Sequence, residues 1–330
     1  MESGSSRPTS RDVAQAAGVS QSTVSLVLAG KWAGRVSAGT AAAVEESARR
    51  LGYRPNAAAR RLRLGQTGAV MLIVPTLSSP FFGAVHAGAS RVAATHGVSV
   101  VVYAGEMRSP FGVAPEAIDG VLASSMTATT SIGELAALPT VLLDSDPAEG
   151  VPTVNFDLVG GFRSIVRHLY GLGHRRFGHL AAGVDAWTFR TRGMAVSAAV
   201  EALGAELVHR PTGIGIPEAR QAALDLLSRA DRPTALICDD DVIAAGAYKA
   251  ARTLGLSIPG DISITGFDDV LLAEALEPEL TSVRLPAEEF GAQGMSALVE
   301  LLEGRTPAPV TLHGQLMIRD STAQPARESS

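Results

Sequence analysis

From Gly68 onward the sequence alternates short apolar runs with longer stretches of helical periodicity, and no other feature limits the possible folds as strongly. Several runs are continuous and β-branched, which is typical of strands covered on both faces. We expect strands at 69–74, 98–103, 120–123, 140–143, 177–181, 235–238 and 262–267, and helices at 81–95, 158–172, 188–203, 217–230, 241–254 and 287–303. This succession predicts two lobes with parallel sheets and right-handed crossovers, and a ligand cleft at the carboxyl ends of the strands.

The stretch from Thr9 to Ala29, TSRDVAQAAGVSQSTVSLVLA, has a different pattern. Ala14, Gly18 and Val24 have the spacing at which a helix-turn-helix needs a small residue, a sharp turn and an apolar contact. The alternative is an ordinary helical hairpin with a polar surface. Short polar side chains on the first turn of the second helix favour the helix-turn-helix, because such side chains can read base edges in the major groove.

Capping residues define the ends of these helices. Thr9 and Asp12 can form a capping box, and Ser20 can cap the second helix. We expect a third helix from Ser37 to about Leu51 and a hinge helix over 57–64. The hinge helix is only two turns long, so we expect it to order when DNA is bound. The expected domains are a head at 9–55, a hinge at 56–66 and a core at 67–321.

Composition limits the class of protein. A length of 330 residues suggests two or three domains, and 46% hydrophobic with 18% charged residues is typical of a folded protein. We expect disorder only at 1–8 and 322–330. The single cysteine, Cys238, excludes an intrachain disulfide and fits a reducing compartment. No apolar run could span a bilayer and residues 1–11 do not form a signal peptide, so we expect a cytoplasmic protein.

Charge is distributed unevenly along the chain. Residues 1–66 contain ten Lys and Arg and four Asp and Glu, a net charge of +6, whereas the whole chain carries −5. The other residues therefore hold −11. A basic head on an acidic body is expected when only the head meets a polyanion, although a run of charge can equally be a solvated face.

An ordered series of motifs runs along the whole chain. It includes DVAQAAGVSQSTVSLVL, RLGYRPNAAARRL, HLYGLGHRRFGHLA, TALICDDDVIAAGAYKAARTLG and IPGDISITGFDD. Through this series the chain resembles the LacI family of bacterial transcriptional regulators, from Thr9 to about Arg319. The resemblance implies an α/β core of two parallel-sheet lobes, similar to periplasmic sugar-binding proteins, with an N-terminal all-α helix-turn-helix head and a hinge helix.

The resemblance also implies DNA contacts in the head and hinge. Leu26 stands where the family often has an arginine, so a contact there would be with a thymine methyl group or absent. Leu62 matches a leucine that the family wedges into the minor groove, although it could instead pack in the core of a short helix. The expected DNA-binding residues are Thr9, Ser20, Gln21, Ser22, Thr23, Ser25, Leu26, Asn56, Ala59, Arg60, Arg61 and Leu62.

In the core, the resemblance places an effector between the lobes. Arg192 matches the family's effector arginine, with Arg190 as a second candidate, and Asp268 matches its acidic contact. Asp240 stands where an asparagine is usual, while Asp239 and Asp241 could serve only the helix end. The expected effector-binding residues are Ser79, Phe81, Trp187, Arg190, Arg192, Asp240 and Asp268. An aromatic ring with Arg and Asp favours a sugar, and a nucleoside would fit similar chemistry.

One segment departs from the family pattern. Between Tyr103 and Asp119 the chain has two prolines and two glycines and is too short for a normal crossover helix with its turns. We therefore expect the first lobe to lack a helix there.

These expectations predict a homodimeric repressor that binds a near-palindromic operator under the control of the effector. We expect no cofactor, no metal and no membrane contact. An enzyme using the aspartates is one alternative, but GxxxxGK[ST], GxSxG and HExxH are all missing. A solute-binding protein without a DNA role is the other, and it would leave the first 66 residues unexplained.

Overall fold

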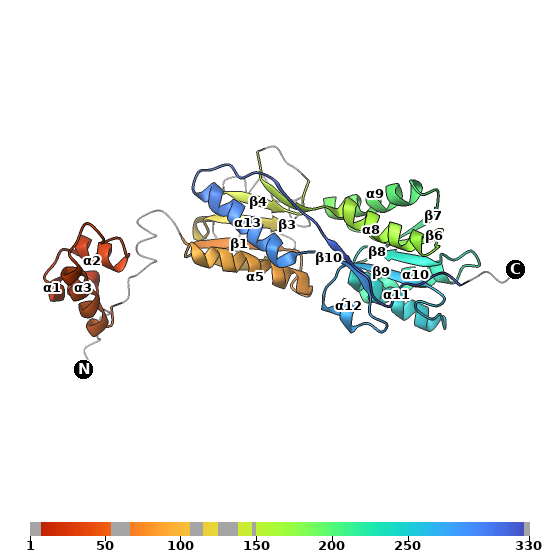
Figure 1. Ribbon diagram of the computed structural model, residues 1–330, viewed down its shortest axis with the longest axis horizontal. Helices are drawn as coiled ribbons and strands as arrows, with labels where there is room; N and C mark the ends of the chain where they lie inside the picture. The colour runs from red at the N-terminus through yellow and green to blue at the C-terminus, as the bar shows by residue number, and fades with distance from the viewer. Residues whose placement is uncertain (1–7, 54–66, 106–114, 125–137, 147–149, 327–330) are drawn as a thin grey trace. The chain divides into compact units, whose positions relative to one another are not determined.

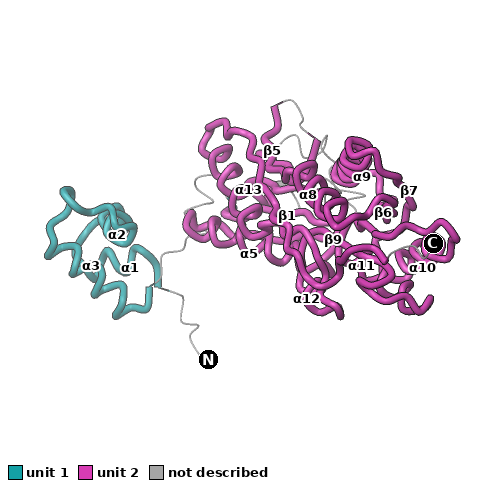
Figure 2. Tube along the Cα trace, turned by 45° about the vertical axis from the view of Figure 1, so that its right-hand side comes forward, with its two compact units in different colours: residues 1–67 teal, residues 68–330 magenta. Residues whose placement is uncertain are grey.

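The computed structural model describes residues 8–53, 67–105, 115–124, 138–146 and 150–326. The chain divides into two compact units, Met1–Thr67 and Gly68–Ser330, and each is described by itself (Figure 2). No described helix is both long enough and apolar enough to cross a membrane.

The first unit contains the helices α1 (Ser10–Ala17), α2 (Gln21–Leu28) and α3 (Ala38–Leu51). Their ends form as predicted. Thr9 and Asp12 make the capping box, with the Thr9 backbone N–H donating to Asp12 Oδ2 at 2.7 Å. Ser20 Oγ accepts from the Thr23 N–H at 3.1 Å, and Ser37 caps α3 in the same way.

Apolar side chains from all three helices form the core of the first unit. Val13, Val24, Val27 and Val44 are almost completely buried. Gly18 ends α1 with a φ of 66°, a left-handed conformation that glycine adopts without steric cost. The tight turn turns α2 back against α1 and α3, which confirms the predicted head fold.

Two six-stranded sheets form the second unit. The first has the order β11-β5-β4-β3-β1-β2 and is parallel at every pairing. Its strands are β1 (Ala69–Val74), β2 (Ser99–Ala104), β3 (Gly120–Ser124), β4 (Thr140–Leu143), β5 (Thr153–Phe156) and β11 (Val310–Leu312). The second has the order β12-β10-β9-β8-β6-β7, and only β12 runs antiparallel. Its strands are β6 (Arg176–Ala182), β7 (Glu206–Thr212), β8 (Ala235–Cys238), β9 (Ser263–Asp268), β10 (Thr281–Arg284) and β12 (Gln315–Met317).

Helices cover the sheets in layers (Figure 1). In the first lobe, α5 (Pro80–Thr95) and α13 (Ala287–Leu302) pack on the face formed by Val70, Leu72 and Val74. In the second lobe, α8 (Leu158–Gly171) and α9 (Trp187–Glu201) share one apolar cluster, and α10 (Ile216–Leu227) and α11 (Asp241–Thr253) share another. These two clusters lie on opposite faces of the second sheet, because neighbouring residues of one strand belong to different clusters.

The chain crosses between the lobes three times. The crossings follow β5, β10 and β11, since α8 belongs to the second lobe, α13 to the first and β12 to the second. Two crossings are joined where the Asp157 N–H donates to Leu312 O at 2.8 Å. Three segments of backbone therefore link the two lobes (Figure 1).

Every predicted strand and helix of the core is present within a few residues, but several elements were not predicted. They are β5, β7, β10, β11, β12, a short helix η1 (Pro115–Ala117) and α12 (Leu271–Ala275). Strand β7 is an exposed edge strand with the sequence ELVHRPT, so it lacks the apolar signal of a buried strand. The other missed strands have only three or four residues, and β5, β10 and β11, unlike the equally short β4 and β8, are interrupted by polar residues.

Three further expectations concern the C-terminal tail, the segment between β2 and β3, and the hinge. The tail was expected to lack structure from Thr322, yet Thr322 Oγ1 lies 2.9 Å from His168 Nε2 and the Ala323 N–H donates to Ser263 Oγ at 3.1 Å. These side chains lie far away in sequence, which is why the tail itself carried no signal. Between β2 and β3 the described residues contain only η1, and residues 106–114 of this segment lie outside the described residues. The predicted hinge helix at 57–64 also lies outside the described residues.

Candidate effector cavity and DNA-binding head

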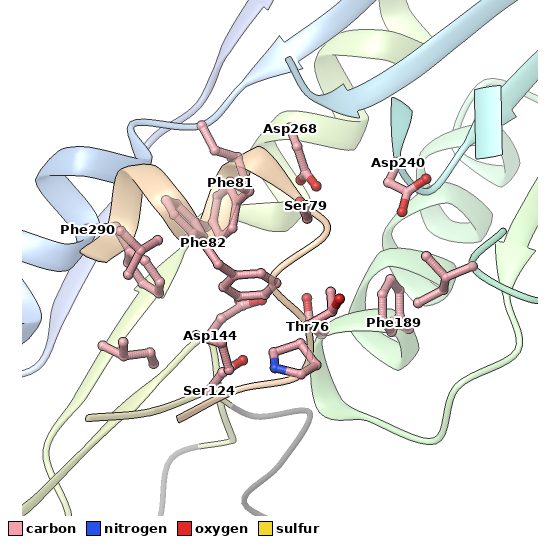
Figure 3. A pocket seen from close by; sticks show the side chains of 18 of the residues that line it. Thr76, Ser79, Phe81, Phe82, Ser124, Asp144, Phe189, Asp240, Asp268 and Phe290 are labelled. Atoms are coloured by element: carbon pink, nitrogen blue, oxygen red, sulfur yellow. The ribbon is translucent and has the colours of Figure 1, made fainter. Parts of the chain in front are cut away.

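A cavity of about 340 Å³ lies at the carboxyl ends of strands from both sheets. The first lobe contributes Thr76 after β1, Ser124 at the end of β3 and Asp144 after β4. The second lobe contributes Asp240 after β8 and Asp268 at the end of β9. In Figure 3, Asp144 and Ser124 lie at one end of the cavity and Asp240 and Asp268 at the other. This is the position at which parallel α/β sheets commonly bind ligands.

Arg192 of α9 is the one cation among the described residues that line the cavity. Its side chain is 6% exposed. Nη1 donates to the backbone oxygen of Asp239, and Nη2 donates to Asp268 Oδ1 at 3.3 Å. Nε is buried without a partner among the described residues. Burial alone would lower the pKa of Arg192, but the charges of Asp268 and Asp144 raise it, so the guanidinium stays charged.

Asp268 and Asp144 face this guanidinium from the two lobes. Burial raises the pKa of Asp268 to about 7, and the charge of Arg192 only partly opposes this effect. Burial also raises the pKa of Asp144, whose Oδ1 has no hydrogen-bond partner among the described residues. Both carboxyl groups therefore hold a proton more readily than an exposed aspartate does.

The acidic run Asp239 to Asp241 divides into three roles. Asp240 lines the cavity and also caps α11, because its Oδ1 accepts from the Ile243 N–H at 2.7 Å. Asp241 is buried away from the cavity and accepts from the Ser282 hydroxyl at 2.6 Å and the Val270 N–H at 2.8 Å. Asp239 accepts from the Ala182 N–H at 2.7 Å and lies 2.8 Å from His179 Nε2. Asp239 and Asp241 therefore hold strand ends together, and only Asp240 faces the cavity.

Aromatic side chains form the walls of the cavity. The ring centroids of Phe81 and Phe82, both on α5, lie 5.3 Å apart in an edge-to-face arrangement. The ring centroids of Phe156 and Phe290 lie 4.3 Å apart. Phe189 of α9 lies across the cavity from Phe81 and Phe82 (Figure 3). Apolar walls with a few convergent polar groups are typical of sites for small organic ligands.

The structure brings five of the seven predicted effector residues to this cavity: Ser79, Phe81, Arg192, Asp240 and Asp268. Trp187 and Arg190 are not in its lining. Trp187 packs against the apolar cluster between the lobes, and the exposed Arg190 pairs with Asp185. Arg190 and Arg192 are two positions apart on a helix, so their side chains point in different directions.

Sequence reasoning missed several lining residues, including Asp144, Phe82, Phe189 and Phe290. Asp144 had a usable signal, because it directly follows a predicted buried strand at the edge where the cleft was expected. The phenylalanines had none. An apolar residue at a helical spacing reads as core, and only the packing of α5, α9 and α13 decides which ring faces a cavity.

In the head, the predicted recognition surface is the start of α2. Gln21, Ser22 and Ser25 are exposed, whereas Thr23 and Leu26 are half-buried. Thr9 and Ser20 are exposed but already bonded within their caps. Ser20 Oγ also lies 3.0 Å from Ser22 Oγ, which holds the first turn of α2 in one arrangement. The predicted contacts Asn56, Ala59, Arg60, Arg61 and Leu62 lie outside the described residues.

Within the described part of the chain, no three His, Cys, Asp or Glu side chains are grouped so that they could hold a metal ion. The one cysteine, Cys238, is buried in the core of the second lobe, and burial raises the pKa of its thiol well above the usual value.

Known proteins match both the head and the core of the chain. A family model described as "Bacterial regulatory proteins, lacI family" matches residues 9–56, and one described as "Periplasmic binding protein-like domain" matches residues 166–322. The HTH-type transcriptional repressor CytR of Escherichia coli is 30% identical over 329 residues, covering 95% of this chain and 96% of CytR.

Two solved structures have the same fold. The complex of the transcriptional regulator CelR with cellobiose is 30% identical, with a TM-score of 0.71, and the match covers 96% of this chain and 100% of that one. The lac repressor dimer bound to operator and the anti-inducer ONPF is 25% identical, with a TM-score of 0.82 and the same coverage. The protein described here belongs to the LacI family of bacterial regulatory proteins.

Proposed function

We propose that this protein is a sequence-specific transcriptional repressor of the cytoplasm whose affinity for its operator is set by a small effector bound between the two lobes. The observation that carries the proposal is that one chain combines an exposed polar recognition turn with an interlobe cavity that contains a buried Arg192–Asp268 pair. The similar CytR is a transcriptional repressor, and the similar lac repressor was solved on its operator as a dimer.

The two sites would communicate through the movement of the lobes. Arg192 and Asp268 come from the second lobe and Asp144 from the first, so a ligand that contacts all three favours one distance between the lobes. In a homodimer, that distance would set the spacing of the two heads on a near-palindromic operator. Such coupling typically amounts to about 1–3 kcal/mol.

We propose a sugar as the effector, with a nucleoside as the alternative. Aromatic walls, an arginine, aspartates and the hydroxyls of Thr76, Ser79 and Ser124 suit a ligand with several hydroxyl groups. The similar CelR was solved with cellobiose. The cavity volume of about 340 Å³ lies at the lower end of the range for small-molecule sites.

Selection from a random DNA library tests the DNA half of the proposal. The purified protein should enrich a near-palindromic sequence. Gln21→Ala should then lower the preference for that sequence by about 1–3 kcal/mol at one position of each half-site, because Gln21 is exposed at the start of α2. Gln15→Ala is the matched control, since Gln15 is an exposed amide on α1. If both variants lost the same affinity for every DNA sequence, the assignment of α2 as the recognition helix would be contradicted.

A pair of arginine variants tests the effector half. Screening sugars and nucleosides by thermal shift should identify a ligand that raises the melting temperature. Arg192→Ala should abolish this shift, whereas Arg190→Ala should preserve it, because only Arg192 lines the cavity. Arg192→Ala should also lower the free energy of unfolding by about 3–5 kcal/mol, since it leaves Asp268 buried without its cation. Loss of the ligand shift in Arg190→Ala alone would refute the site.

A further inference from the structure

The described lining of the cavity contains more acidic than basic side chains. Asp144, Asp240 and Asp268 supply three carboxyl groups, and Arg192 supplies the one guanidinium. Arg192 is already committed, because its Nη1 and Nη2 donate to Asp239 O and Asp268 Oδ1. Asp144 and Asp240 therefore feel the charge of Arg192, but neither forms an ion pair or a hydrogen bond with a cation among the described residues.

Ionising these buried carboxyl groups is energetically unfavourable in the protein without a ligand. A buried carboxylate without a partner loses its hydration, and several such groups in one cavity repel one another. Burial is the largest cause that raises the pKa of each of the three carboxyl groups, and the charges of Asp240 and Asp144 further raise the pKa of Asp268. A positive charge in the cavity would remove this cost.

A second observation shows where hydrogen bonds are still available. Nε of the 95% buried Arg192 has no partner among the described residues, and neither do Asp144 Oδ1 and Thr188 Oγ1, which lie close enough for the hydroxyl to lower the pKa of Asp144 but do not meet in hydrogen-bonding geometry. Buried polar atoms are nearly always paired, so these atoms are expected to bond a ligand. Asp144 Oδ1 can only accept when it is ionised, which calls for a donor.

We infer that the effector is a small polyol that bears a positively charged amino group, of the chemical class of the amino sugars, with the ammonium group held by Asp240 and Asp268 at one end of the cavity and a sugar hydroxyl donating to Asp144 at the other. This inference rests on the proposed function and narrows the effector class within it. The hydroxyls of Thr76, Ser79, Ser124 and Thr188 would bind the sugar hydroxyls. The rings of Phe82 and Phe189 add apolar walls that also attract a cation. An anionic sugar phosphate would meet the carboxyl groups instead.

Isothermal titration calorimetry on the full chain at about pH 7 tests the inference. The probes are glucosamine, galactosamine and mannosamine, each compared with its parent sugar and its N-acetyl derivative. Some amine should bind about 10-fold more tightly than both of its neutral counterparts, because only the amine is charged. Binding should also release protons, seen as heats that differ between two buffers, since an ammonium group lowers the pKa of the carboxyl groups around it.

Asp240→Asn separates charge from shape. Asparagine keeps the helix cap and the size of the side chain but removes one negative charge. The variant should weaken binding of the amine about 10-fold and change binding of the neutral parent by less than about 2-fold. Asp231→Asn is the control, because Asp231 is exposed, pairs with Arg229 and lies outside the cavity lining.

The outcomes distinguish the inference from the proposed function. If a neutral sugar or its N-acetyl derivative binds as tightly as the amine, or if Asp240→Asn weakens both alike, the inference is wrong and the proposed function stands. If every one of these sugars fails to bind while a nucleoside shifts the melting temperature, the inference is also wrong and the alternative effector takes its place. If no sugar and no nucleoside binds, both the inference and the effector half of the proposed function fail.

Discussion

At the scale of single residues, the cavity contains carboxyl groups whose pKa values are raised by burial. Asp268 has a pKa of about 7, although Arg192 lies within 3.3 Å. The reason is that removing an aspartate from water disfavours its charge more than one shared guanidinium favours it. Arg192 itself stays charged because several carboxyl groups surround it.

This raised pKa gives the free protein a pH dependence. Between about pH 4 and pH 7 the native Asp268 holds a proton that the unfolded chain has released, so its contribution to the free energy of unfolding should fall as the pH rises through this window, whereas His168, His174 and His209, whose pKa values are lowered by burial, contribute with the opposite sign. Asp268→Asn should remove the contribution of Asp268. Urea unfolding at several pH values, followed by tryptophan fluorescence, measures it.

A control is needed because Asp144 and Asp240 contribute with the same sign. Asp231→Asn should leave the slope between about pH 5 and 7 unchanged, since the pKa of the exposed Asp231 is lowered by its bond with Arg229 and it is ionised throughout this range. A slope that is the same in Asp268→Asn and in the original protein would contradict the raised pKa.

At the residue scale, the family resemblance supplied the expected effector residues, and the structure shows which of them line the cavity. Arg192, Asp240 and Asp268 were expected at the cavity and lie there. Trp187 and Arg190 were also expected there but are not in the cavity lining, because a position near Arg192 in the sequence does not fix the direction of a side chain on a helix. Asp144 was missed although its place after a buried strand indicated it.

At the scale of elements, helices α5 and α13 of the first lobe are packed with their backbones in contact. A Cβ on Gly88 would lie 1.8 Å from the backbone oxygen of Glu288, and one on Gly291 would lie 1.9 Å from that of Val85. Glycine is required at both positions because no side chain fits between two backbones at this distance. The same two helices carry Phe81, Phe82 and Phe290 to the cavity wall.

Moving α5 and α13 apart should destabilise the folded protein. We expect Gly88→Ala and Gly291→Ala each to lower the free energy of unfolding by about 1–3 kcal/mol, because the helices must move apart to admit a methyl group. Both should also weaken effector binding, since Phe81, Phe82 and Phe290 would shift. Thermal or urea unfolding together with the ligand titration measures these effects.

Gly83 is the matched control in the same helix. A Cβ there meets no atom within 4 Å, so Gly83→Ala should stabilise the protein by about 0.5–1 kcal/mol by favouring the helix. Equal effects of alanine at positions 83 and 88 would show that the contact between α5 and α13 is not as close as described.

At the scale of the whole molecule, the sensing part and the DNA-binding part belong to separate compact units. Residues 68–330 contain both sheets, the three crossings and the complete described cavity. The basic charge is gathered in the first 66 residues, at +6, and the rest of the chain holds −11. Each unit therefore has its own core, and only the first has the charge to attract DNA.

We expect the fragment 68–330 to fold and to bind the effector with the affinity of the full chain, but to lose affinity for DNA. The full chain should bind its operator less tightly as salt increases, because the basic head displaces counterions from the phosphates. Calorimetry of the fragment and DNA binding at several salt concentrations measure both. A fragment that cannot bind an effector bound by the full chain would show that the first unit takes part in the cavity.

The sequence by itself determined the elements whose signals are local. Periodicity, capping residues and turn glycines depend on neighbours in the chain, so the three head helices, the buried strands and the core helices could be predicted from them. The exposed turn of α2 follows in the same way. The family resemblance placed Arg192, Asp240 and Asp268 because ordered motifs fix positions along the chain.

Tertiary structure alone decided what depends on distant contacts. The short strands β10, β11 and β12 form because an established sheet offers them a partner, and the tail from Thr322 is held by His168 and Ser263. The raised pKa of Asp268 also follows from burial, which no single segment specifies. The excess of carboxyl groups in the cavity, and with it the chemistry of the proposed effector, exists only because two lobes bring separate strand ends together.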